Sequence, residues 1–148
     1  MPRVPRAPAV AALAVFLIAA DASPAPLPTP AIVSGTPQTV HAYVAPATSQ
    51  YVADFPKPLV VRITGKYDHV RFSCPALHCG LHVADEANTP GTRVNARSYD
   101  AVVKNGTASL QIGLATDLPS AVSMVYAQAV DSDGTLGPKS APFVLSSQ

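Results

Sequence analysis

Proline constrains this chain more than any other residue type. Of the 16 prolines among its 148 residues, 13 lie beyond residue 22 and recur along most of the remaining sequence. Because proline lacks a backbone N–H and clashes with the preceding helical turn, this spacing leaves little room for long helices. A chain of 148 residues also favours one domain and excludes an elaborate multidomain enzyme.

From about residue 38 onward, apolar residues recur with a period of two. The apolar members of the runs are Val40, Ala42 and Val44; Leu59, Val61 and Ile63; Val70, Phe72 and Cys74; Ala108, Leu110, Ile112 and Leu114; and Val125, Ala127 and Ala129. Such alternation places apolar side chains on one face of a strand, as antiparallel sheets with one buried face require. Asn105-Gly106 and Asp133-Gly134 predict tight turns between strands, because these residue types tolerate positive φ. We therefore predict an all-β domain over 38–148, an antiparallel β-sandwich of about seven strands.

Residues 1–22 have the composition of an export signal. Two arginines precede a largely apolar run, and Ala20-Asp21-Ala22 supplies the pattern of small residues found before a cleavage site. The apolar run is shorter than the roughly 20 residues that span a bilayer. We predict cleavage before Ser23, export to the periplasm or the medium, and no transmembrane segment in the mature chain. The alternating prolines that follow predict an extended linker over 23–37.

The charge balance excludes one class of partner. Ten Lys and Arg side chains stand against nine Asp and Glu side chains, which gives a net charge of +1. Nucleic-acid binding proteins neutralise phosphates with a strongly basic surface, so we expect no nucleic-acid partner. With 48% hydrophobic residues, the chain is also unlike a disordered polyelectrolyte.

One short segment, CPALHCGLH at 74–82, carries residue types capable of chemistry. Cys74, His78, Cys79 and His82 form a possible ligand set for zinc or copper. In an exported protein, the competing reaction is oxidation of the two cysteines to each other. A Cys74–Cys79 disulfide closes a small loop and contributes about 2 kcal/mol through the entropy of loop closure. We favour the disulfide, which needs no cofactor; a metal site of these four residues is the alternative.

The segment Asp131-x-Asp133-Gly134 has two interpretations. It resembles the start of a calcium loop, but Thr135 follows the glycine and no Glu occurs after Glu86. Aspartate and glycine at such positions are typical of a hairpin turn. We favour the turn.

Residues 122–145 resemble the last two strands of an immunoglobulin-like (Ig-like) or fibronectin type III-like domain. The segments that carry the resemblance are Ala129-Val130-Asp131, Ser132-Asp133-Gly134 and Ser140-Ala141-Pro142-Phe143. The resemblance implies an Ig-like β-sandwich and says nothing of activity. The chain differs from antibody domains because it has no Trp and its two cysteines lie too close in sequence to join two sheets.

No sequence motif for catalysis is present: G-x-S-x-G, H-E-x-x-H and the glycine-rich phosphate and dinucleotide loops are all absent. We therefore expect no enzyme. The expected function is an exported bacterial module with a binding or structural role in the cell envelope, contacting a protein or polysaccharide through its loops. The expected contact patch combines the 75–82 corner with the 131–137 turn, the latter through Asp131, Asp133 and Gly134. The alternative is a periplasmic zinc- or copper-binding protein that uses the cluster at 74–82.

Overall fold

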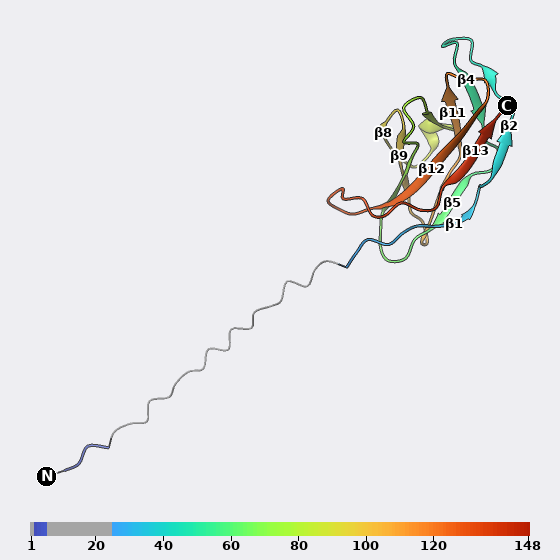
Figure 1. The fold of residues 1–148 in the computed structure, drawn as a ribbon. Helices are drawn as coiled ribbons and strands as arrows, with labels where there is room; N and C mark the ends of the chain where they lie inside the picture. The colour runs from blue at the N-terminus through green and yellow to red at the C-terminus, as the bar shows by residue number, and fades with distance from the viewer. Residues whose placement is uncertain (1, 6–24) are drawn as a thin grey trace.

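The computed structural model describes residues 2–5 and 25–148, and within them it contains 13 strands and one short 3₁₀ helix (Figure 1). The all-β prediction is confirmed, although the expected count of about seven strands is not. Apart from residues 2–5, the predicted export signal lies outside the described residues. In the part of the chain that is described, no helix has the length and apolar character needed to cross a membrane.

The strands form three sheets, and neighbouring strands are antiparallel except for one parallel pair, β2 and β13. The three-stranded sheet has the order β1 (Ala31–Ser34), β5 (Leu59–Arg62) and β10 (Thr107–Leu110). The four-stranded sheet has the order β3 (Tyr43–Val44), β4 (Tyr51–Asp54), β11 (Ile112–Thr116) and β7 (Gly80–Val83). The six-stranded sheet has the order β2 (Gln38–Val40), β13 (Phe143–Ser147), β12 (Ala121–Val130), β6 (His69–Ser73), β9 (Ser98–Val102) and β8 (Gly91–Asn95).

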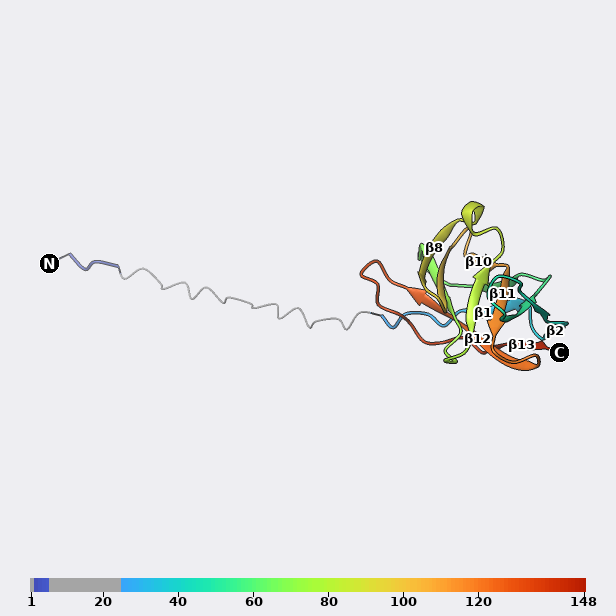
Figure 2. The same ribbon diagram turned by 90° about the horizontal axis from the view of Figure 1, so that it is seen from above.

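The two smaller sheets continue into each other, because β4 leads into β5 and a single residue, Gln111, separates β10 from β11. They therefore form one layer, and the six-stranded sheet forms the other, an arrangement compatible with a β-sandwich (Figures 1 and 2). The core between the layers includes Phe72 of β6 and Phe143 of β13, whose ring centroids lie 6.1 Å apart.

Four of the five predicted apolar faces are buried. The positions predicted to face the core in 59–63, 70–74, 108–114 and 125–129 are all buried. The first run differs, since Val44 is 51% exposed and β3 contains only two residues. The apolar alternation thus locates the central strands correctly and overestimates the burial of this edge strand.

Part of the segment expected as a linker belongs to the fold. Ala31–Ser34 forms β1 and pairs with β5, and Pro30 is buried. Leu27 packs against the core and approaches the 131–137 turn, where a Cβ placed on Gly137 would lie 2.8 Å from the Leu27 Cβ. The folded region therefore begins well before residue 38.

A buried glutamine fixes the place where the chain crosses from one layer to the other, between β1 and β2. The Gln38 Nε2 donates hydrogen bonds to the carbonyl oxygens of Gly35 and Lys57, each at 2.8 Å. Its Oε1 accepts a hydrogen bond from the Lys57 N–H at 3.1 Å. Because Gln38 is buried, these bonds satisfy groups that would otherwise be costly to remove from water.

Both predicted turns are confirmed. Asn105 and Gly106 have φ values of 52° and 72°, and Lys104 and Thr107 exchange two backbone hydrogen bonds of 2.9 and 3.0 Å. In the second turn Gly134 has a φ of 85°, and its N–H donates to the Asp131 carbonyl at 2.9 Å. The Asp133 carboxylate accepts the Thr135 N–H, which lowers the pKa of Asp133.

Candidate functional site

The cysteines of the 74–82 segment form the expected disulfide, with Cα atoms 6.1 Å apart. Both cysteines are buried. The Cys74 N–H donates to the Arg97 carbonyl at 3.0 Å, and the Arg97 Nη1 donates to the Pro75 carbonyl at 3.2 Å. The corner between β6 and β7 is therefore closed covalently and also bound to the turn between β8 and β9.

The two histidines of this segment are exposed, whereas the two cysteines are buried. His78 is exposed, and its Nδ1 lies 3.1 Å from the Asp117 Oδ2. His82 is on the exposed face of β7, between buried Leu81 and Val83. Across residues 2–5 and 25–148, no three His, Cys, Asp or Glu side chains are grouped closely enough to hold a metal ion. The disulfide uses both thiolates, so a metal site that includes Cys74 and Cys79 requires the reduced protein.

A groove runs over β7 on the outer side of the four-stranded sheet. It consists of two adjoining hollows of about 470 and 220 Å³ that share Gln50, Gly80, Ala96 and Ala115. Gly80 and Ala115 are cross-strand partners on β7 and β11. Neither carries a side chain larger than a methyl group; Gly80 is half-buried and Ala115 is buried at the bottom of the groove.

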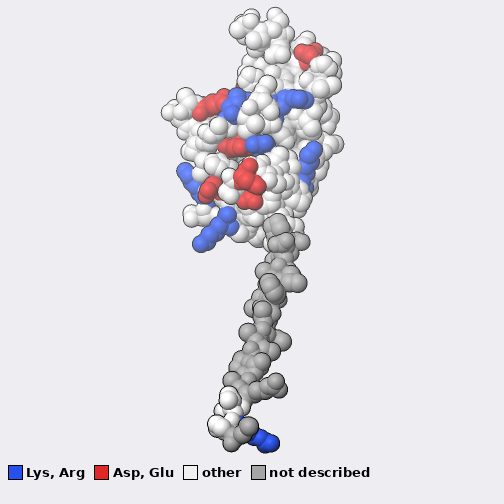
Figure 3. All heavy atoms as spheres, turned by 90° about the vertical axis from the view of Figure 1, so that its left-hand side faces the viewer, with Lys and Arg blue, Asp and Glu red and all other residues white. Residues whose placement is uncertain are grey.

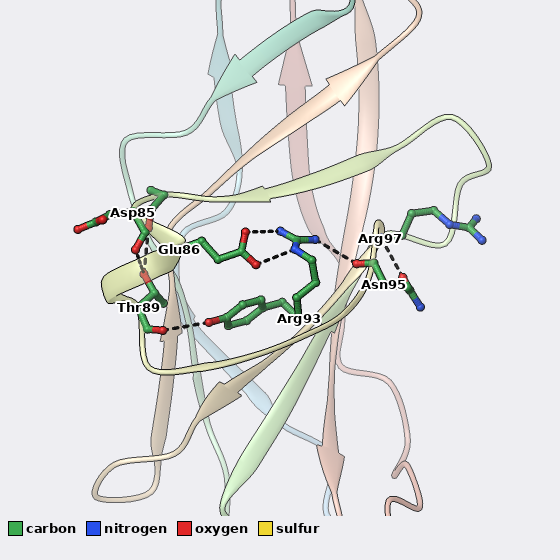
Figure 4. Close-up of polar contacts among 8 residues, drawn as sticks. Asp85, Glu86, Thr89, Arg93, Asn95 and Arg97 are labelled. Carbon is green, nitrogen blue, oxygen red and sulfur yellow. Dashed lines mark hydrogen bonds and ion pairs between the residues drawn. The ribbon is translucent and has the colours of Figure 1, made fainter. Parts of the chain in front are cut away.

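An ion pair closes one end of the groove, beside the 3₁₀ helix η1 (Glu86–Asn88) (Figure 4). Arg93 of β8 donates from Nε and Nη2 to the two Glu86 carboxylate oxygens, at 2.6 and 3.1 Å, and from Nη1 to the Asn95 carbonyl at 3.0 Å. The hydrogen bond from Arg93 lowers the pKa of Glu86. Every donor nitrogen of this guanidinium already has a partner, so the pair presents little free charge to a ligand.

A buried tyrosine supports the same end of the groove. Tyr99 of β9 is 1% exposed, and its hydroxyl donates to the Thr89 carbonyl at 3.1 Å. Burial raises the pKa of Tyr99. This bond holds the segment that follows η1 against the six-stranded sheet, and so fixes Glu86 relative to Arg93.

The charged side chains at the other end contact groups of the protein itself. His78 contacts Asp117, whereas Arg97 donates to two backbone carbonyls and takes part in none of the ion pairs formed by the described residues. The remaining polar side chains along the groove are the amide of Gln50 and the imidazole of His82. The groove therefore offers hydrogen-bonding groups and a concave shape to a ligand.

The two loops of the expected contact patch lie apart. His69 pairs with Val130 and Ser73 pairs with Tyr126, so the 131–137 turn flanks the start of β6 and the disulfide corner follows its end. Asp131, Asp133 and Gly137 line a different hollow, of about 350 Å³, together with residues 25–27. The structure thus brings the 75–82 corner into the groove and places Asp131 and Asp133 beside the incoming chain, while Gly134 lies in the same turn but does not line that hollow.

Charged side chains of both signs are interspersed on the face shown in Figure 3. One close pair is Arg71 with Asp100 on neighbouring strands β6 and β9, with two hydrogen bonds of 2.7 and 2.9 Å. The hydrogen bond to Asp100 raises the pKa of Arg71. This face carries no continuous basic patch of the kind that binds phosphate backbones.

Sequence reasoning did not find most of the groove. It singled out His78, Cys79 and His82, but missed the floor residue Ala115 and the Glu86–Arg93 pair. These residues come from segments far apart in the chain, and no spacing pattern links them. The one local signal was Gly80, directly after Cys79, because a glycine leaves that position of a strand without a side chain.

No protein-family model, curated protein or solved structure matches this chain. The resemblance of 122–145 to Ig-like domains therefore rests on those residues alone, and the fold is compatible with a β-sandwich.

Proposed function

We propose that this chain is an exported Ig-like module of a bacterial envelope that binds a protein or polysaccharide partner through the groove over β7. The observation that carries the proposal is the groove itself. Its floor of Gly80 and Ala115 carries no side chain larger than a methyl group, and its rim is held by the disulfide at one end and by the Glu86–Arg93 pair at the other. A concave surface fixed on two sheets is preorganised, so little ordering cost accompanies binding.

Strand order supports the Ig-like part of the proposal. In Ig-like sandwiches one sheet has the order A-B-E-D and the other contains C, F and G. Here β1, β4–β5, β10–β11 and β7 follow the first order, and β6, β12 and β13 provide the second set. The hairpin β8–β9 is inserted in the chain between β7 and β10, and it extends the second sheet beside β6.

The position of the groove supports a binding role. Residues 25–30 enter the domain beside the 131–137 turn, whereas β4, β11 and the C-terminus lie towards the other end (Figures 1 and 2). A domain attached or oriented through its N-terminal segment therefore presents the groove away from the attachment. Catalysis plays no part in the proposed function.

Substitution of the two free polar groups in the groove tests this function. For the mature chain, we expect Gln50→Ala with His82→Ala to weaken binding to purified envelope material by about tenfold, because two hydrogen bonds are lost. The probes are purified peptidoglycan sacculi and a detergent-solubilised envelope protein fraction, measured separately by pull-down with quantified protein. His41→Ala is the matched control, since His41 is an exposed histidine outside the groove. Equal binding by both variants and wild type, or no binding to either probe, contradicts the proposal.

A further inference from the structure

The strand β10 has an open edge. It ends the three-stranded sheet and pairs only with β5 among the described strands. The continuation of the same strand, β11, is covered on the corresponding side by β7. Because β7 pairs only with residues 112–115, the edge of β10 is left without a neighbouring strand.

The backbone hydrogen bonds show which residues face this edge. The Ile63 N–H donates to the Gly106 carbonyl at 2.9 Å, so Gly106 points towards β5. Backbone groups alternate in direction along a strand, which turns those of Ala108 towards β5 and those of Thr107 and Ser109 towards the open edge.

The positions on either side of Ser109 are already occupied. Thr107 exchanges two backbone hydrogen bonds with Lys104, and the Gln111 carbonyl accepts the Ala84 N–H at 2.9 Å. Ser109 lies between them on an edge with no partner strand in the described part of the chain. One rung of a β-ladder is therefore missing at this residue.

A hollow of about 290 Å³ lies along the missing rung. Its lining residues are Thr107 and Ser109 of β10, Val102 and Lys104, and Thr89 and Pro90. Lys104 is the single charged residue that lines the hollow, and it takes part in none of the ion pairs formed by the described residues. The volume is at the low end for ligand pockets, which suits a short segment of chain.

We propose that this hollow binds a short extended peptide that pairs with the backbone N–H and C=O of Ser109 and places a carboxylate at Lys104. Adding a strand to an open sheet edge supplies backbone hydrogen bonds, and a neighbouring pocket or charge supplies selectivity. The carboxylate belongs either to an acidic side chain or to a peptide C-terminus. This hollow is separate from the groove over β7, so a result that contradicts one binding site does not contradict the other.

Selection from a displayed library of random octapeptides tests the proposal. The target of the selection is the mature chain with its disulfide intact. The library is used in two formats, one with free peptide C-termini and one with the peptide fused at both ends. The selected sequences are then synthesised, and their affinities are measured by fluorescence anisotropy. We expect Lys104→Gln to weaken binding about fivefold and Lys104→Arg to weaken it less than about twofold. Lys66→Gln, at an exposed lysine away from the hollow, is the matched control and is expected to leave affinity unchanged.

Two further changes identify the contacts. N-methylation of the peptide residue opposite Ser109 removes a donor and is expected to weaken binding about tenfold. If Lys104 binds the terminal carboxylate, amidation of the peptide C-terminus is expected to weaken binding by the same factor as Lys104→Gln. If Lys104 binds an acidic side chain, Asp→Asn or Glu→Gln in the peptide is expected to weaken binding by that factor instead. In ¹⁵N spectra the Ser109 amide is expected to shift and to exchange more slowly on peptide addition.

Three results overturn the proposal. The first is no enrichment over a selection without protein. The second is binding to Lys104→Gln as tight as to wild type. The third is binding that leaves the Ser109 amide unperturbed. Gln50→Ala with His82→Ala is expected to leave peptide affinity unchanged, which separates this site from the groove.

Discussion

Gly35→Ala is expected to lower the free energy of unfolding by about 2–4 kcal/mol. Gly35 has a φ of 101°, a conformation that L side chains rarely adopt. A Cβ at this position would also collide with the Pro58 carbonyl oxygen and would lie 2.8 Å from the Leu59 Cα. Both obstacles are backbone, which cannot swing aside as a side chain does, so the crossing between β1 and β2 must shift.

Urea denaturation of Gly35→Ala and Gly134→Ala separates the cost of the positive φ from the cost of the collision with the backbone. Gly134 has a φ of 85°, but a Cβ there would meet nothing within 4 Å. Its substitution therefore carries only the conformational cost, about 1–2 kcal/mol. If the two variants are destabilised equally, the close approach of Gly35 to the Pro58–Leu59 backbone is not what makes glycine necessary at the crossing.

Cys74→Ala with Cys79→Ala is expected to lower the free energy of unfolding by at least about 2 kcal/mol. The loop-closure entropy of the unfolded chain accounts for this amount, and the loss of two buried sulfur atoms adds to it. The loss should also loosen the corner, because Cys79 directly precedes Gly80 in the floor of the groove. Backbone amides of 75–80 are then expected to exchange faster with solvent.

The matched measurement is the wild-type protein with its disulfide reduced, compared with the oxidised protein in the same denaturant series. Reduced wild type should be less stable than the oxidised protein and more stable than the double variant, by about 1 kcal/mol in the second case, since the reduced protein loses the covalent link but keeps its buried sulfur atoms. A double variant as stable as the oxidised protein contradicts a structural role for the disulfide.

The disulfide and the central strands were predictable because their causes are local. Cys74 and Cys79 are close in sequence, and strands with one buried and one solvent-exposed face show an alternation of apolar and polar residues. β8 was not predicted, because as an edge strand it has mostly exposed residues and no apolar alternation. β11 departs from alternation in the opposite way, since all five of its residues are buried.

The burial of β11 depends on a contact that sequence does not reveal. Gly113 alternates with Ile112 and Leu114, which places it on the face opposite the core, but the Asp54 carboxylate occupies the space where its Cβ would lie. The Tyr43 hydroxyl donates to the other Asp54 oxygen at 2.8 Å, which holds this cover in place and raises the pKa of Tyr43. The groove has the same origin, because Gln50, Ala96 and Ala115 meet only in the folded chain.

The intact native mass of the protein recovered from its export compartment reports the cleavage site, the redox state of Cys74 and Cys79 and any bound metal in one measurement. We expect a chain that begins at Ser23, lighter by two hydrogens than the reduced form, and without bound metal. Such a mass establishes processing and the Cys74–Cys79 disulfide together. A chain that retains residues 1–22, or a metal adduct with both thiols reduced, contradicts the account. The second result would favour a metal site that uses Cys74, His78, Cys79 and His82.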